Sequence, residues 1–340
     1  MSPVFSRGLA GSSRAVAATA TALLLAAAAS GCGATPNAGP SGAPTSSSTS
    51  SQPLGESSVV GLSGWLFYVG YDRVFRLTPD GLVLVLSDAY SASVSPDGGW
   101  IAYGDEQGHL FVADSAGGQV RALVADEVLV VTGFEPSWSP DSRRLLVGRS
   151  LGDGGVELGV VEVSSGSFTP LAHQVEAIHP LWSVDGSGLG FATGTCEVGV
   201  ADADGGNAAL VPVVGDVDVS VNPLGRRSCD PFSLSADGVL MAVNQRAGDE
   251  PDGDIGRDGV ANAVVDTATG AQVSVPVVGQ VSAVLFLADG AALVRSTDVG
   301  VTSLTLLNPD LTVANQFTEP STVADTCAEV GCSLLTYAPA

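Results

Sequence analysis

Short apolar runs alternate with polar turns from about residue 60 to the end of the chain. Examples of such runs are 65–69, 101–103 and 240–243, and Gly, Asp, Ser and Pro fill the intervals between them. Apolar runs of this length, bounded by turn-forming residues, predict β-strands joined by tight turns. The pattern therefore predicts an all-β domain over residues 58–340.

One turn phrase recurs between these runs and is centred on an aspartate. In its clearest form it reads Ser-Pro-Asp-Gly, as at 95–98, and an apolar strand follows it. Proline presets φ, the aspartate side chain closes the turn and glycine accepts a positive φ, so the phrase reverses one strand into the next. The turn aspartates are Asp97, Asp141, Asp185, Asp237 and Asp289, at intervals of 44, 44, 52 and 52 residues.

This spacing predicts a β-propeller, because one four-stranded blade takes about 44 residues. Residues 65–85 supply three strands of a further blade, and 333–337 is expected to supply its missing inner strand. Such closure leaves no exposed sheet edge; Val59-Val60 is the competing candidate. We predict about six four-stranded blades, with seven as the alternative. The bulky residues three positions before the turn aspartates are expected to pack between blades, and they are Trp138, Trp182, Leu234 and Phe286.

The turn phrase resembles the repeat of TolB-type β-propellers, in which Trp-Ser-Pro-Asp-Gly precedes a strand such as Ile-Ala-Phe. The clearest copies are 93–98, 136–142 and 180–186, whereas those at 232–238 and 286–290 are more divergent. The resemblance covers nearly all of residues 60–317 and implies a TolB-like propeller domain. TolB itself carries a helical domain before its propeller. None is predicted here, so the role of TolB in the envelope complex is not carried over.

The first 31 residues have the pattern of a lipoprotein signal peptide. Arg7 and Arg14 precede an uncharged apolar stretch at 15–29, which is too short for the ~30 Å hydrocarbon core of a bilayer. Ala29-Ser30-Gly31-Cys32 resembles the bacterial lipobox, so lipidation is predicted at Cys32. An ordinary secretory signal with an incidental cysteine is the alternative. We expect an extracytoplasmic protein, lipid-anchored in the cell envelope at the outer membrane or cell surface.

Residues 32–57 comprise the lipidated cysteine and a segment rich in Ser, Thr, Pro, Gly and Ala. Such a segment cannot bury enough apolar surface to offset its ordering entropy, so it predicts a flexible linker.

The net charge of the chain limits the classes of partner that it can bind. Asp and Glu number 36 against 13 arginines and no lysine, giving a net charge of −23. This excess excludes a nucleic-acid partner, which needs a basic surface.

Four cysteines remain beyond Cys32, and an even number in an exported chain allows three disulfide pairings. Cys196 falls between the second and third strands of its blade, and Cys229 falls between that blade and the next. Both connections emerge on one face of a propeller, which favours a Cys196–Cys229 bridge. Cys327 and Cys332 would then pair near the closing strand. Four reduced core cysteines are the alternative.

A Gly- and Asp-rich insertion at 248–259 is the candidate cation site. Asp252, Asp254 and Asp258 offer oxygen ligands of the kind that Ca²⁺ prefers. The EF-hand pattern fails, because alignment on Gly253 places Gly248 and Gly259 where acids belong. We therefore expect a solvated acidic loop and no cofactor, with Ca²⁺ as the alternative. The loop shares the face of the Cys196–Cys229 pair, which favours that face as the partner surface.

No catalytic motif is present. The sequence lacks a Gly-x-Ser-x-Gly pentapeptide and phosphate-binding glycine loops, and its three histidines (His109, His173 and His179) are expected to be ordinary loop residues. We therefore predict a non-enzymatic, monomeric platform that binds an envelope protein or small ligand and contacts the membrane through its lipid. The alternative is a propeller hydrolase or lyase that acts on an envelope or extracellular carbohydrate, with a divalent metal.

Overall fold

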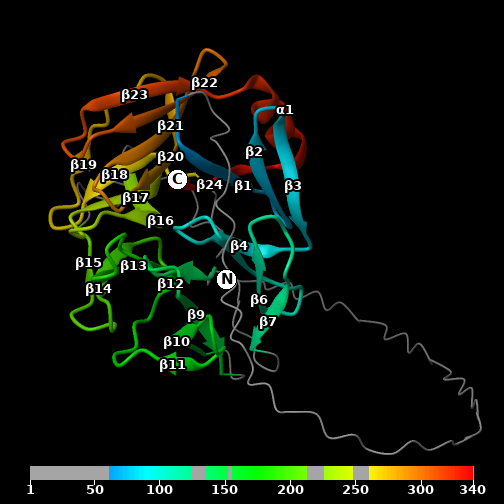
Figure 1. Cartoon of the computed structure of the whole chain (residues 1–340). Helices are drawn as coiled ribbons and strands as arrows, with labels where there is room; N and C mark the ends of the chain where they lie inside the picture. Colours follow the sequence, from blue (N-terminus) through cyan, green and yellow to red (C-terminus); the bar gives the residue numbers. More distant parts are fainter. Residues whose placement is uncertain (1–60, 125–134, 152–154, 213–225, 248–259, 340) are drawn as a thin grey trace, which may run out of the picture. The chain divides into compact units, whose positions relative to one another are not determined.

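Six four-stranded antiparallel sheets arranged in a ring make up the fold (Figure 1). The computed structural model describes residues 61–124, 135–151, 155–212, 226–247 and 260–339. All of them belong to the unit 51–340. The predicted six-bladed propeller is confirmed over this part of the chain. The predicted signal peptide (1–31) and linker (32–57) lie outside the described residues.

The strands of each blade follow the chain from the ring centre outward, except in blade 1, whose inner strand is the last of the chain. Blades 1 and 2 comprise β24 (Ser333–Pro339), β1 (Gly64–Val69), β2 (Arg73–Thr78) and β3 (Gly81–Ser87), then β4 (Tyr90–Val94), β5 (Trp100–Gly104), β6 (Leu110–Asp114) and β7 (Arg121–Val124). Blades 3 and 4 comprise β8 (Ser137–Trp138), β9 (Arg144–Ser150), β10 (Val156–Glu162) and β11 (Phe168–Pro170), then β12 (Ile178–Trp182), β13 (Gly188–Ala192), β14 (Val198–Asp202) and β15 (Ala209–Leu210). Blades 5 and 6 comprise β16 (Arg226–Leu234), β17 (Leu240–Ala247), β18 (Ala263–Asp266) and β19 (Gln272–Val273), then β20 (Gln280–Phe286), β21 (Ala292–Asp298), β22 (Val301–Leu307) and β23 (Val313–Thr318).

Antiparallel pairing of β24 with β1 closes the ring, in a register that places Gly64 opposite Pro339. This confirms the prediction that 333–337 supplies the inner strand of blade 1; the competing Val59-Val60 lies outside the described residues. Each inner strand also contacts the inner strand of the next blade. The ring is therefore continuous, and no blade is left with an open seam.

The repeated turn is built by one serine and one aspartate side chain. In blade 2 the Ser95 hydroxyl donates to Asp97 Oδ1, and the same oxygen accepts the Gly99 N–H. Ser139 and Asp141 repeat the pair in blade 3, where the Ser139 hydroxyl bond lowers the pKa of the Asp141 carboxyl. These local bonds explain why the phrase predicts strand reversals so well. The same serine–aspartate bond recurs at Ser183–Asp185 and Ser235–Asp237.

Six apolar clusters fill the six seams between neighbouring blades. Trp138, for example, packs with Val112 of blade 2 and Val161 of its own blade. The predicted packing of bulky residues between blades is thus confirmed. Burial of large apolar side chains is the main favourable term in folding, so the seams supply most of the stability of the ring. The four residues concerned, Trp138, Trp182, Leu234 and Phe286, are each no more than 7% exposed.

A buried polar contact strengthens the closing seam between blades 6 and 1. Glu319, which follows β23, accepts two bonds from Arg295 of β21, at 2.9 Å from Nε and 2.7 Å from Nη2. Tyr68 of β1 donates its hydroxyl to the same carboxylate. Arg295 Nη1 also donates to Ser282 Oγ of β20 at 3.0 Å. Charge-assisted bonds therefore join both sides of the seam.

One helix that the sequence pattern did not predict, α1 (Ser321–Val330), leads from β23 to β24. It ends at Gly331, whose left-handed φ of 68° suits a helix C-cap. Among its residues only Val323 is buried. The helix lacks a side-chain N-cap, so packing rather than local propensity holds it. Among the described residues, no helix has the length and apolar character needed to cross a membrane.

The ring has two faces, which differ in the segments that they carry. We call the end with the turns between first and second strands, such as 95–98, and between third and fourth strands, such as 115–120, the turn face. The opposite end carries the loops between second and third strands and the connections between blades, and we call it the connection face. This division follows from the antiparallel pairing within each blade.

Candidate functional site on the connection face

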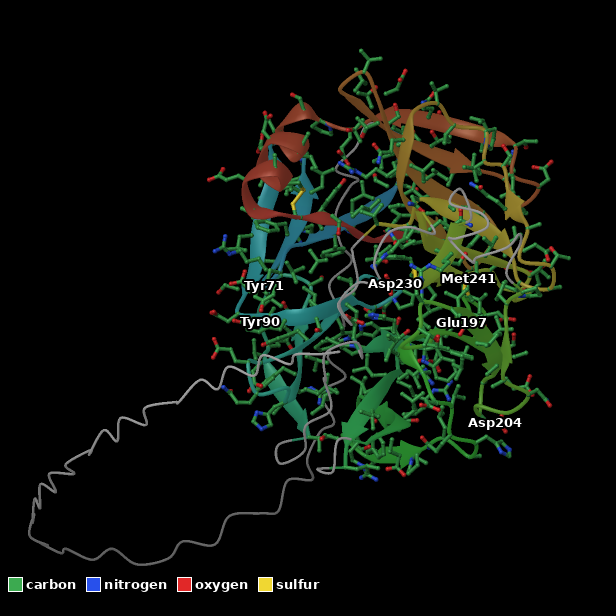
Figure 2. The ribbon with its side chains drawn as sticks, turned by 180° about the vertical axis from the view of Figure 1, so that it is seen from behind. Tyr71, Tyr90, Glu197, Asp204, Asp230 and Met241 are labelled. Carbon is green, nitrogen blue, oxygen red and sulfur yellow. A yellow bond between two sulfur atoms is a disulfide. The ribbon has the colours of Figure 1, made fainter. Side chains whose placement is uncertain are left out.

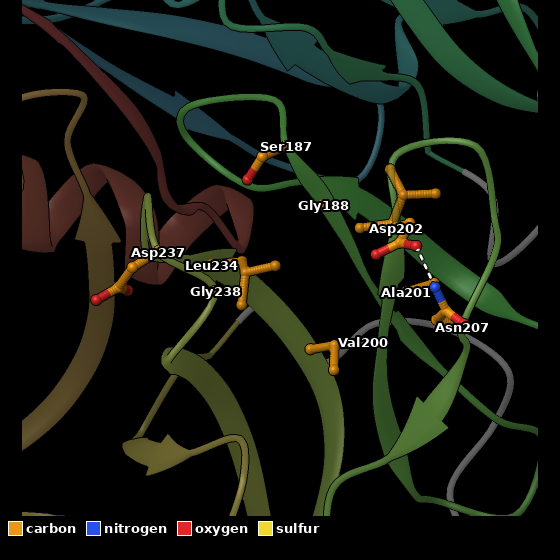
Figure 3. A pocket seen from close by; sticks show the side chains of 10 residues that line it. Ser187, Gly188, Val200, Ala201, Asp202, Asn207, Leu234, Asp237 and Gly238 are labelled. Atoms are coloured by element: carbon orange, nitrogen blue, oxygen red, sulfur yellow. Dashed lines mark hydrogen bonds between the residues drawn. The ribbon is translucent and has the colours of Figure 1, made fainter.

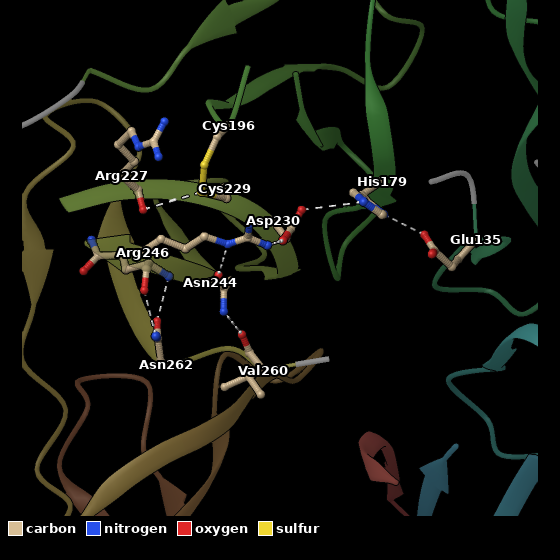
Figure 4. A network of polar contacts seen from close by, with 11 residues as sticks. Glu135, His179, Cys196, Arg227, Cys229, Asp230, Asn244, Arg246, Val260 and Asn262 are labelled. Carbon is tan, nitrogen blue, oxygen red and sulfur yellow. Dashed lines mark hydrogen bonds and ion pairs between the residues drawn. A yellow bond between two sulfur atoms is a disulfide. The ribbon is translucent and has the colours of Figure 1, made fainter. Parts of the chain in front are cut away.

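A buried histidine near the connection face joins three consecutive blades. His179 of β12 has a fully buried side chain, and its Nδ1 lies 2.8 Å from Glu135 Oε2. Its Nε2 lies 3.6 Å from Asp230 Oδ1 (Figure 4). Glu135 precedes β8 of blade 3, whereas Asp230 belongs to β16 of blade 5. Carboxylates from both neighbouring blades therefore flank the imidazole of blade 4.

The repeat itself places these residues side by side. Glu135 and His179 each stand six residues before the aspartate of their blade's turn, and Ser91 has the same position in blade 2. His179 and Ser91 both have a left-handed backbone, with φ of 47° and 49°. The pairing register shifts at both places. Such a bulge redirects a side chain, so the inner strand can point this residue along the seam.

The polar chain continues from Asp230 into blade 5. Asp230 Oδ2 lies 3.4 Å from Arg246 Nη2, and Arg246 Nε donates to Asn244 Oδ1 at 3.1 Å. Asn244 Nδ2 donates in turn to the Val260 carbonyl at 3.0 Å. Asp230, Asn244 and Arg246 are all less than 10% exposed. Buried polar groups of this kind hold their partners in one arrangement, because any unpaired member is costly. We call Glu135, His179, Asp230, Arg246 and Asn244 the polar chain.

The β16–β17 hairpin extends past the rest of its blade at the connection face. Ladder pairing of β17 with β18 stops at Val243, but the hairpin continues through the pairs Ser228–Gln245 and Arg227–Arg246. The side chain of Asn262 extends the ladder in place of backbone. Its Oδ1 accepts the Gln245 N–H at 2.7 Å, and its Nδ2 donates to the Gln245 carbonyl at 2.9 Å. The projecting ribbon is therefore anchored along its outer edge.

A disulfide fastens this ribbon to blade 4. Cys229 of β16 is bonded to Cys196 in the β13–β14 loop, with 4.1 Å between their Cα atoms. Cys327 of α1 is bonded to Cys332, with 4.4 Å between Cα atoms. The structure thus brings together both cysteine pairs that the sequence predicts, although Cys229 lies within an inner strand and not in a connection. The predicted lipidation residue, Cys32, lies outside the described residues.

The geometry of the polar chain does not suit a metal ion. The two carboxylates face opposite nitrogens of the His179 ring, so they cannot share one ion with it. Across the described part of the chain, no group of three or more His, Cys, Asp or Glu could hold a metal. The candidate Ca²⁺ ligands Asp252, Asp254 and Asp258 lie outside the described residues.

The three histidines have separate environments. His109, in the β5–β6 loop, has its Nδ1 2.8 Å from Asp105 Oδ2. His173, with a side chain 66% exposed, lies 4.0 Å from Asp204. The interpretation of His179 as an ordinary loop histidine is wrong, because it is buried in an inner strand between two carboxylates. Its shared repeat position with Glu135 is the sequence signal that would have revealed this contact.

A groove of about 250 Å³ lies between blades 4 and 5, beside their Ser-x-Asp turns (Figure 3). Its two carboxylates already serve local structure. Asp202 Oδ2 accepts the Asn207 amide at 2.6 Å, and Asp237 Oδ1 accepts the Ser235 hydroxyl at 2.7 Å. The groove is therefore explained by turn geometry, and the connection face remains the candidate site.

Part of the chain is similar to a known protein. No family model matches the chain. The Tol-Pal system protein TolB of Anaeromyxobacter dehalogenans is 32% identical over 114 residues, which are 33% of this chain and 25% of that protein. The match thus spans a quarter of its relative. The chain is a six-bladed β-propeller similar to TolB over this stretch.

Two solved structures show a similar course of the chain. TolB from Acinetobacter baumannii has a TM-score of 0.47 and 16% identity, over 76% of this chain and 66% of that chain. An oligogalacturonate lyase in complex with manganese has a TM-score of 0.46 and 13% identity, over 71% of this chain and 69% of that one. At such identities the likeness concerns the fold and transfers no activity.

Proposed function

We propose that this protein is a non-enzymatic binding protein of the cell envelope, and that its connection face holds an envelope protein or small ligand. The polar chain is the observation that carries this proposal. It joins blades 3, 4 and 5 through buried contacts and meets the disulfide-fastened ribbon. A surface fixed in this way loses little conformational freedom when a partner binds. The loops that a rigid scaffold carries also vary most in sequence, and they often hold the binding residues.

The similarity to TolB supports the envelope part of the proposal. That relative is by name a component of the Tol-Pal system, and 114 residues of this chain match it at 32% identity. Two disulfides further support an extracytoplasmic location, because such bonds persist in oxidising compartments. Lipid attachment at Cys32 would then hold the propeller, as a monomer, at the outer membrane or cell surface. Replacing Cys32 with Ser should abolish incorporation of a labelled fatty acid.

Site-specific photo-cross-linking in cells tests the partner surface. A cross-linking residue is placed at Leu151 or Val299 on the connection face, which are 55% and 95% exposed. Matched positions on the turn face are Val120 and Val239, which are 53% and 43% exposed. We expect discrete cross-linked products from the first pair and none from the second. Products from the turn face alone would contradict the proposal. Turnover of an acidic oligosaccharide with Mn²⁺ or Ca²⁺ would favour the lyase alternative instead.

A further inference from the structure

Two tyrosines, Tyr71 exposed and Tyr90 half-buried, contact each other on the connection face, away from the polar chain (Figure 2). Tyr71, in the β1–β2 loop, is 83% exposed, and it is the one aromatic among the exposed large hydrophobics of the described residues. Its ring meets that of Tyr90, at the start of β4, edge to face with 5.6 Å between centroids. Folding gains little from a ring left in water, so core packing does not explain this residue.

Three carboxylates surround the pair. The Tyr90 hydroxyl donates to Glu106 Oε1 at 3.3 Å. Asp72 directly follows Tyr71 in the chain, and Asp88 lies two residues before Tyr90. Partial burial, followed by the charges of Glu106, Asp72 and Asp88, raises the pKa of the Tyr90 hydroxyl. Asp72 also pairs with Arg73 at 3.4 Å, whereas Asp88 and Glu106 have no ion pair within the described chain. We call Tyr71, Tyr90, Asp72, Asp88 and Glu106 the tyrosine–carboxylate patch.

The patch is held in place by backbone contacts between segments of two blades. The Ala89 N–H donates to the Asp72 carbonyl at 3.0 Å, which fixes the β3–β4 connection against the β1–β2 loop. The Gly70 N–H closes that loop on the Arg73 carbonyl at 2.8 Å. In the β5–β6 loop, Asp105 Oδ1 accepts the N–H groups of Gln107 and His109 at 2.9 Å each. The partner would therefore meet a preformed surface.

We propose that the patch binds a cationic side chain, arginine above all, in an exposed segment of a partner protein. An aromatic face attracts a cation, and a guanidinium can stack on Tyr71 while its N–H groups reach Asp88 or Glu106. Carboxylates alone would not define a partner, since the whole chain is acidic. The exposed ring of Tyr71 beside them offers a cation one specific place to bind, in addition to the general attraction of an acidic surface. This inference rests on the proposed function, because it names the chemistry of the partner for the same face.

A carbohydrate fits the patch less well. Sugars stack on an exposed aromatic ring, and their hydroxyls both donate and accept hydrogen bonds, so a sugar site needs donors as well as acceptors. Here the rings meet at 89°, and the Tyr90 hydroxyl is already donated to Glu106. The remaining polar atoms of Asp88 and Glu106 are anionic acceptors, which favour a cationic donor. The observations therefore favour an arginine-bearing peptide.

Fluorescence anisotropy with the full-length protein and a labelled peptide of alternating arginine and glycine tests this inference at ~0.15 M salt. We expect Tyr71→Ala to weaken binding about two- to fivefold. Tyr71→Phe, which keeps the ring, should bind as the native chain does. Replacing both Asp88 with Asn and Glu106 with Gln should weaken binding about three- to tenfold. All three positions are on the surface, so the urea midpoint should be unchanged in each variant.

Two control variants separate a specific contact from general attraction. Asp325→Asn removes one exposed carboxylate from α1, and Val239→Ala removes an exposed apolar side chain from the turn face. Neither should change binding of the peptide. A loss in Asp325→Asn as large as that in the Asp88→Asn/Glu106→Gln double variant, or native affinity in Tyr71→Ala, would overturn the inference. Competition by the neutral sugar chitohexaose would also overturn it, in favour of a carbohydrate.

The two proposals can fail separately. Cross-links at Leu151 and Val299, together with peptide binding that is indifferent to Tyr71, would refute only the cationic contact. Peptide binding that depends on Tyr71, without any cross-link at those positions, would instead refute the partner assignment.

Discussion

Glu135 and His179 stand 44 residues apart at the same position of successive blades, and their side chains meet at 2.8 Å. A second contact across the same seam is offset from the repeat by one residue, because the Trp182 N–H donates to the Ser137 hydroxyl 45 residues earlier. Equivalent or adjacent positions of consecutive inner strands thus become contacts around the ring centre. A substitution at such a position acts on two blades at once.

Removal of the buried imidazole should destabilise the domain. In His179→Ala, the carboxylates of Glu135 and Asp230 would be left facing a buried void, and we expect a loss of about 2–4 kcal/mol in the free energy of unfolding. Urea denaturation followed by tryptophan fluorescence measures this loss. His173→Ala serves as the control, because its exposed side chain should cost less than about 0.5 kcal/mol. Equal losses in the two variants would contradict the role assigned to the polar chain.

Loss of the Glu319 charge should destabilise the closing seam more than loss of the Tyr68 hydroxyl. Glu319→Gln leaves Arg295 partly buried without its carboxylate, for an expected loss of about 2–4 kcal/mol. Tyr68→Phe removes only one hydrogen bond to that carboxylate and should cost about 1 kcal/mol. Guanidinium unfolding of both variants gives the comparison. A smaller loss for Glu319→Gln than for Tyr68→Phe would show that the Arg295 contact contributes little.

Tyr68 should make the stability fall at alkaline pH. Burial, then the charge and hydrogen bond of Glu319, raise its pKa well above the ordinary value of 10.0. The folded protein therefore keeps this proton where the unfolded chain has lost it. Its stabilising contribution is present below pH 10 and is lost as the pH rises through the folded value. Unfolding free energies measured from pH 8 upward should decline less steeply in Tyr68→Phe, and an unchanged slope would refute the assignment.

The two disulfides should contribute unequally. Cys196 and Cys229 are separated by 33 residues, Cys327 and Cys332 by 5. Loop-closure entropy gives about 2–4 kcal/mol for the first bond and about 1–2 kcal/mol for the second. Replacing each pair with serines and measuring chemical denaturation under oxidising conditions tests this order. Addition of dithiothreitol should then lower the stability of the native chain but not that of the fourfold variant.

The insertion at 248–259 should bind no structural cation. We expect EDTA to leave the melting temperature of the full chain unchanged, since Gly248 and Gly259 occupy the positions where an EF-hand has acids. Differential scanning fluorimetry with and without about 1 mM CaCl₂, roughly tenfold above the ~0.1 mM Kd of the tighter extracellular Ca²⁺ modules, completes the test. A Ca²⁺-dependent rise that disappears in Asp252→Asn would assign a site to this loop.

The architecture could be predicted from the sequence because its determinants are local. Ser95 and Asp97 form the bond that closes their turn within three residues of chain, and a regular spacing of such turns then implies repeated blades. The closing strand was predictable for a topological reason, because 65–85 supplies only three strands and the chain end offers a fourth; Val59-Val60 was the competing candidate. Packing of Trp138 and its equivalents in the seams followed from the same repeat.

Only one contact of the candidate site, Glu135–His179, has a signal in the sequence, because the burial of this site depends on neighbouring blades. Nothing near His179 in the chain reveals that Asp230 lies 3.6 Å away, on a strand of the next blade. The exposure of Tyr71 is likewise a property of the assembled face. Helix α1 was missed because it lacks a side-chain N-cap, and tertiary contacts stabilise it instead.

Pairing of β24 with β1 joins the last strand of the chain to the first, so blade 1 is completed only when the end of the chain has been synthesised. The blade whose outer strands are made first is the blade that is completed last, since its inner strand comprises Ser333–Pro339. A nascent or prematurely terminated chain would therefore present the bare edge of β1, which is a template for pairing with another molecule. The ring thus makes completion of the fold depend on the length of the chain, because residues 333–339 must be present for the edge of β1 to be paired.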